Sequence, residues 1–151
     1  MTRRTHGTFN VVAALVLAIA AGSVTGCDTG EDGTAVGPRG GIVTSDDGRV
    51  TLDIPAGALA DVVQLRIVEA TELPEDAIGP AYEVLPAGVT FSIPAEVAYD
   101  VADGADIDPS AVQLVIERDE NWRPLADRDV DMANLEVSAS MVYSATVAIV
   151  E

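Results

Sequence analysis

Apolar and polar residues alternate along most of the chain after Gly40. Val50, Leu52 and Ile54, for example, are separated by single polar residues. Because successive side chains of a strand point to opposite faces, a period of two predicts strands with one buried face. No window has the 3.6-residue period of an amphipathic helix longer than about two turns. The alternating segments are residues 41–44, 50–54, 63–68, 82–84, 90–100, 112–117, 135–137 and 141–149.

Turn-forming sequences separate these segments, among them Asp46-Asp47-Gly48, Pro55-Ala56-Gly57 and Pro86-Ala87-Gly88. Short strands joined by such turns are typical of an antiparallel sandwich. We therefore expect an all-β fold, a single antiparallel β-sandwich that follows a signal peptide and a flexible tether. Pro94 interrupts one strand, and since proline cannot donate to a ladder we expect an edge strand or a bulge there. Trp122 is expected to fill the core or the rim.

The first 26 residues have the features of a secretory signal. Arg3 and Arg4 precede an apolar run over residues 11–21. As a helix this run spans only about 16 Å, roughly half of the hydrocarbon core, so it is too short for a permanent membrane span. The sequence Val24-Thr25-Gly26-Cys27 that follows resembles a bacterial lipobox. The resemblance implies cleavage between Gly26 and Cys27.

The lipobox also implies that Cys27 receives a covalent lipid. Two or three acyl chains, at about 0.8 kcal/mol per buried methylene, give a stable anchor. Because Cys27 is the only cysteine, an internal disulfide is excluded. We expect a lipid-anchored protein of a bacterial cell envelope, on a periplasmic or surface face, with a tether over residues 27–40 and the sandwich over residues 41–151.

The composition excludes several kinds of chemistry. Removal of residues 1–26 takes away His6 and two of the eight basic residues but none of the 25 acidic ones, so the mature chain carries a net charge of −19. It has no lysine, and lipid would occupy its one thiol. Such a chain offers no Ser-His or Cys-His nucleophile, no Schiff base and no imidazole ligand for a metal. Its negative charge also makes nucleic acid a poor partner.

Clustered carboxylates raise the alternative of calcium binding. Asp127, Asp129 and Asp131 have the spacing of the first half of a calcium loop. However, Met132 stands where an EF-hand has glycine, and Ser138 stands where it has a bidentate glutamate. Solvated hairpin turns are the simpler interpretation of these residues. A second acidic loop contains Asp103, Asp106 and Asp108.

Two blocks of the chain resemble a ZU-type domain, a family named for zonula occludens proteins and Unc netrin receptors. The first runs from Gly40 through Gly48-Arg-Val-Thr-Leu-Asp-Ile-Pro-Ala-Gly-Ala-Leu59, and the second covers residues 79–94. The resemblance implies a β-sandwich used for protein contacts. Some relatives cleave themselves at a His-Phe-Ser sequence, and Val142-Tyr143-Ser144 stands at the corresponding position. Since Val142 replaces the histidine, we predict that this chain does not cleave itself.

Together these features predict an envelope lipoprotein whose non-catalytic sandwich contacts another protein or a cell-wall polymer. The first alternative is a calcium-dependent adhesion or carbohydrate-binding module. The second is a glycoside-acting enzyme with a carboxylate pair, which the low aromatic content disfavours. The outward positions Val142, Ala148 and Val150 form either a second buried face or an exposed docking surface.

Overall fold

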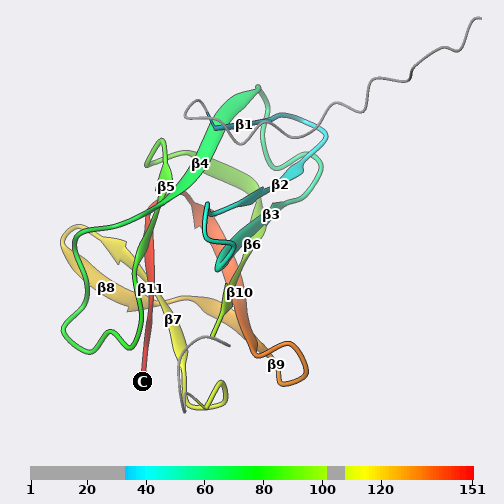
Figure 1. Ribbon diagram of the computed structural model, residues 1–151. Helices are drawn as coiled ribbons and strands as arrows, with labels where there is room; N and C mark the ends of the chain where they lie inside the picture. Colours follow the sequence, from blue (N-terminus) through cyan, green and yellow to red (C-terminus); the bar gives the residue numbers. More distant parts are fainter. Residues whose placement is uncertain (1–32, 102–107) are drawn as a thin grey trace, which may run out of the picture.

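The computed structural model describes residues 33–101 and 108–151, which contain eleven strands and no helix (Figure 1). No helix in this part of the chain is therefore long and apolar enough to cross a membrane. The strands are β1 (Thr34–Val36), β2 (Gly41–Thr44), β3 (Val50–Ile54), β4 (Val63–Glu69), β5 (Tyr82–Leu85), β6 (Thr90–Asp100), β7 (Gln113–Arg118), β8 (Asn121–Pro124), β9 (Ala126–Asp131), β10 (Glu136–Tyr143) and β11 (Thr146–Val150).

The strands form two sheets in which all neighbours are antiparallel. The six-stranded sheet has the order β1-β4-β5-β11-β7-β8, and the five-stranded sheet has the order β2-β3-β6-β10-β9. Their inner faces enclose one main hydrophobic core, in which Leu52, Leu65, Tyr82, Tyr99 and Ile149 are almost completely buried. The rings of Tyr82 and Tyr99 meet edge to face, with centroids 5.7 Å apart. The structure thus confirms the all-β sandwich that the two-residue period predicts.

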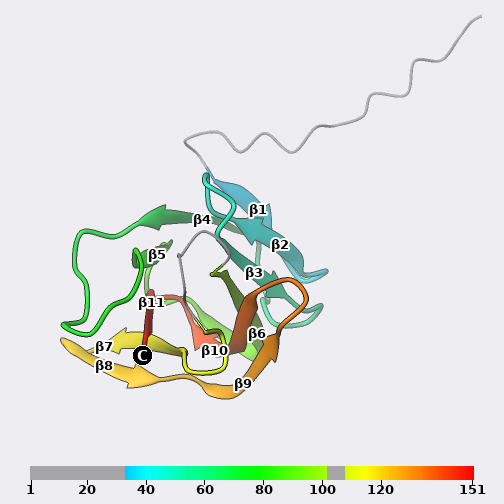
Figure 2. The ribbon, with the colours of Figure 1, turned by 60° about the horizontal axis from the view of Figure 1, so that its bottom comes forward.

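Several connections pass from one sheet to the other, and two of them, β1–β2 and β8–β9, form the corners that Figure 2 shows. At the second corner the amide of Leu125 donates to the carbonyl of Leu114, 2.9 Å away. Each corner joins an end strand of one sheet to an end strand of the other.

The first corner corrects the boundary expected for the sandwich. Residues 34–36, expected to belong to the flexible tether, form β1 and pair with β4, Thr34 opposite Leu65 and Val36 opposite Val63. Val36 is buried in the core. The prediction failed because a three-residue strand between glycines shows too little alternation to be recognised. The sandwich therefore includes residues 34–36, ahead of the boundary expected at residue 41.

The two outer faces differ. The long β4–β5 connection, green in Figure 1, contributes Ala70 and Ala81 to a small cluster on the six-stranded sheet. Ala81, Val115 and Ala148 are buried there, with Val150 and Trp122 packed against them. Ala148 and Val150 thus belong to a second buried layer, and Trp122 lies at its rim. Val142, by contrast, is 49% exposed.

Pro94 lies at a bulge, which is one of the two alternatives expected from the sequence. The register of β10 and β6 shifts between the pairs Met141–Ala95 and Tyr143–Thr90. The expectation of an edge strand was wrong, because β6 lies between β3 and β10. The irregular register accommodates a residue that has no amide to donate.

Candidate functional site

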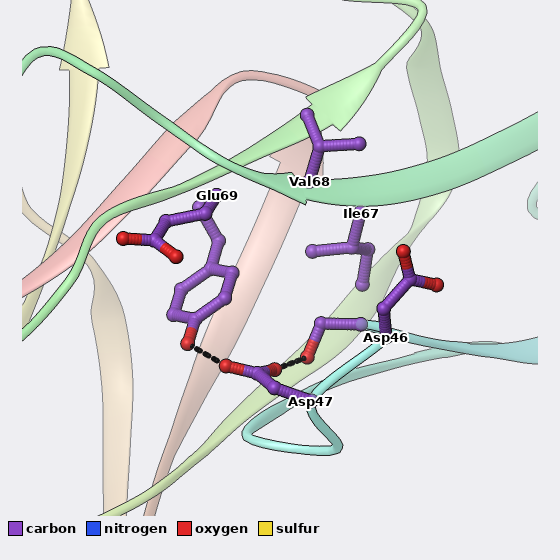
Figure 3. Close-up of a pocket in the computed structure, with 7 residues that line it drawn as sticks. Asp46, Asp47, Ile67, Val68 and Glu69 are labelled. Carbon is purple, nitrogen blue, oxygen red and sulfur yellow. Dashed lines mark hydrogen bonds between the residues drawn. The ribbon is translucent and has the colours of Figure 1, made fainter.

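A pocket of about 210 Å³ opens where the β2–β3 turn meets the other sheet (Figure 3). The turn supplies Asp46 and Asp47, and β4 supplies the apolar side chains next to Glu69. Figure 3 shows Asp46 and Glu69 on opposite sides of the pocket. The full lining is Ser45, Asp46, Asp47, Ile67, Val68, Glu69 and Tyr82.

Asp47 is the centre of the hydrogen bonds in this pocket. Its carboxylate accepts from the hydroxyl of Ser45 at 2.6 Å, from the amide of Arg49 at 3.2 Å and from the hydroxyl of Tyr82. The buried hydroxyl of Ser45 in turn accepts from the amide of Val50 at 3.0 Å. Asp47 therefore links a turn of the five-stranded sheet to Tyr82 on β5 of the six-stranded sheet.

The ionisation of this pair suits a structural role. Burial raises the pKa of Asp47, but the hydrogen bonds from Ser45, Tyr82 and Arg49 outweigh it and hold that pKa below its usual value. Burial, followed by the bond to Asp47, raises the pKa of Tyr82 well above its ordinary value. Each group is stabilised in the charge state that its hydrogen bond requires. The carboxylate of Asp47 thus accepts hydrogen bonds from groups of its own fold rather than from a substrate.

The outer face of the five-stranded sheet carries carboxylates directly opposite one another. Glu136 on β10 pairs with Asp100 on β6 and with Asp131 on β9. Asp53 on β3 pairs with Glu96 on β6. Partial burial, followed by the negative charges of Asp131, Asp100 and Glu96, raises the pKa of Glu136. Like charges in register cost stability, so this face is under electrostatic strain.

The calcium candidates do not converge within the described part of the chain. Asp127 and Asp129 lie on the exposed edge strand β9, and Asp131 ends it. Asp131 accepts from the amide of Ala133 at 2.8 Å and from the amide and side chain of Asn134 at 3.2 and 2.7 Å, which closes the hairpin. No group of three or more metal-ligating side chains occurs among the described residues.

The second acidic loop is described only in part. Asp103 and Asp106 lie outside the described residues. Asp108 caps a turn by accepting from the amide and the hydroxyl of Ser110 at 2.9 and 2.7 Å. The one described carboxylate of this loop is thus bound within its own turn.

Ser144 is buried and bonded on both sides of its hydroxyl. Its Oγ donates to the carbonyl of Pro86 at 2.6 Å and accepts from the amide of Val89 at 2.8 Å. Its backbone adds two bonds to the same turn, from its amide to Val89 and to its carbonyl from Gly88. The hydroxyl therefore holds the turn between β5 and β6.

Beside that turn lies an open groove of about 360 Å³, which we call the Tyr143 groove. The guanidinium of Arg118 lies 5.8 Å from the centre of the Tyr143 ring. Arg118 also approaches Asp119, with Nε and Oδ2 3.7 Å apart, but Asp119 is exposed and does not line the groove. The lining is Gly88, Thr90, Phe91, Arg118, Val142 and Tyr143.

No protein-family model matches the chain, and no curated protein shows significant similarity to it. The resemblance to a ZU-type domain therefore stays a prediction made from sequence motifs. Gly26 and Cys27, the predicted cleavage and lipidation site, lie outside the described residues.

Proposed function

We propose that this chain is a lipid-anchored protein of a bacterial cell envelope whose sandwich binds another envelope protein or a cell-wall polymer without catalysis. The anchor is inferred from the lipobox-like sequence that ends at Cys27. The binding role is inferred from the surface of the sandwich.

The observation that carries the binding role is the exposure of Val142 in the Tyr143 groove. Val142 is 49% exposed although its neighbours Met141 and Phe91 are buried. It lies beside Tyr143 and Arg118, and aromatic residues and arginine are the types most enriched in the energetic centres of protein interfaces. Because the groove combines an exposed aliphatic residue with an aromatic ring and an arginine, it is the best candidate for a protein contact surface.

The Tyr143 groove also differs electrostatically from the rest of the molecule. The mature chain has a net charge of −19, yet the groove is lined by one arginine and by no carboxylate. A partner can therefore bury apolar surface there without desolvating an acidic group, which would be costly. This supports a contact made by apolar and aromatic side chains with Arg118 at the rim.

The experiment compares cross-linking of three proteins to isolated envelopes. A soluble chain that begins at residue 28 is prepared as wild type, as Val142→Asp and as Leu73→Asp, the last a matched control because Leu73 is exposed to a similar extent and does not line the groove. We expect one envelope component to be captured by the wild type and the control and to be lost with Val142→Asp. Equal capture by all three would refute the Tyr143 groove as the contact surface.

A further inference from the structure

The start of the sandwich places the domain close to its anchor. β1 begins at Thr34, and Gly33 packs so tightly against β4 that an added Cβ would lie 2.7 Å from the carbonyl oxygen of Leu65. Only five residues, 28–32, therefore lie between Cys27 and Gly33. The six steps from the Cα of Cys27 to the Cα of Gly33 span at most about 22 Å, because an extended chain advances about 3.3–3.6 Å per residue. The corner that contains β1 cannot move far from the lipid.

The same corner exposes apolar side chains. Ile42 on β2 is 60% exposed, and Val62, just before β4, is 67% exposed. Val62 lies against the β1–β2 turn, where an added Cβ on Gly37 would meet its Cγ2 at 2.9 Å. Arg39 lies in the same β1–β2 turn, and Arg66 lies on β4. They are two of the six arginines that follow the predicted signal.

We propose that this corner, the β1–β2 turn with Ile42 and Val62, rests on the phospholipid surface that holds the lipid anchor. The inference depends on the proposed lipid anchor at Cys27. A tether of this length keeps the corner at a high effective concentration near the headgroups, so that a contact of modest affinity is occupied. Burial of two aliphatic side chains in the interface then favours one orientation of the domain.

The distribution of charge favours the same orientation. The facing carboxylates Glu136 and Asp131 lie on β10 and β9, at the far side of the five-stranded sheet from β2. Four strand spacings separate β2 from β9, or about 19 Å. With β2 at the membrane, these carboxylates lie away from the negative surface of an anionic bilayer. The corner itself holds two exposed carboxylates, Asp53 opposite Ile42 and Asp61 next to Val62, so its contact with the bilayer depends on the aliphatic side chains and on the tether.

The test measures the depth of single residues in the full lipidated protein. Because the only native thiol would be lipidated, a cysteine introduced by Ile42→Cys or Val62→Cys can be labelled uniquely with an environment-sensitive fluorophore. Met132→Cys is the matched control, since Met132 is 58% exposed and lies in the hairpin after β9. Each labelled protein is reconstituted in vesicles of phosphatidylethanolamine and phosphatidylglycerol that contain a lipid with a nitroxide in its headgroup region.

We expect quenching at positions 42 and 62 to exceed that at position 132 by about twofold or more, because of the separation of about 19 Å across the sheet. Equal quenching at the three positions, in protein whose amino-terminal peptide carries lipid by mass spectrometry, would overturn this inference alone. An amino-terminal peptide without lipid would overturn both the anchor and the inference.

Discussion

The buried hydroxyl of Ser144 gives the sharpest test of how the β5–β6 turn is held. Ser144→Ala removes one donor to Pro86 and one acceptor for Val89 and leaves the backbone bonds of the turn in place. Each hydrogen bond contributes a net of about 0.5–1.5 kcal/mol, and an amide left without a partner costs about 1–3 kcal/mol. We expect the free energy of unfolding to fall by about 2–3 kcal/mol.

The assays are urea denaturation, which gives the free energy of unfolding, and thermal melting of a soluble chain that begins at residue 28. A loss of this size in a domain of about 120 residues should lower the melting temperature by roughly 8–12 °C. Ser140→Ala is the control, because Ser140 lies half-buried on the outer face of β10, and it should change stability by less than about 0.5 kcal/mol. A similarly small change for Ser144→Ala would refute the structural role. On a denaturing gel, wild type and variant should both remain one chain, whereas a fragment that starts at Ser144 would contradict the prediction of no self-cleavage.

Three further predictions follow from the carboxylates. Asp47→Asn should destabilise the fold by about 1–2 kcal/mol at neutral pH, with Asp46→Asn as the control. Because the pKa of Asp47 is lowered in the folded state, the stability that its carboxylate contributes should disappear as the pH falls through that pKa. A constant difference in stability between wild type and Asp47→Asn from neutral pH to well below pH 3.8 would contradict this. Glu136→Gln should stabilise the fold at neutral pH by up to about 1 kcal/mol, whereas the control Glu72→Gln should not. Since the pKa of Glu136 is raised in the folded state, the gain in stability should shrink as the pH falls below that pKa. No gain at neutral pH would argue against charge repulsion on the outer face of the five-stranded sheet. Millimolar calcium should leave the melting temperature unchanged, and a clear rise would restore the calcium alternative.

The fold could be predicted from the sequence because one face of most strands is apolar. Val50, Leu52 and Ile54 show the period without ambiguity, and all three are buried. The pattern failed where a strand is short, as at residues 34–36, because three residues do not establish a period. It also could not tell an edge from a bulge at Pro94, since both remove the need for an amide donor.

The contacts of the site were harder to predict, because they join residues far apart in the chain. Asp47 and Tyr82 are 35 residues apart, and only the packing of the two sheets brings them together. The Tyr143 groove likewise combines Phe91 and Arg118 with the end of β10. The sequence offered one signal, the apolar Val142 at an outward position, but gave no means to decide whether another layer covers it.

The β1–β2 and β8–β9 corners, which join the end strands of the two sheets, bear on how this domain unfolds. β8 leads through Leu125 directly into β9, so a slip of register in one sheet would pull on the other. The β1–β2 corner imposes the same condition on the opposite side. Neither sheet can unfold as an independent subdomain, and we therefore expect the sandwich to unfold in one cooperative step.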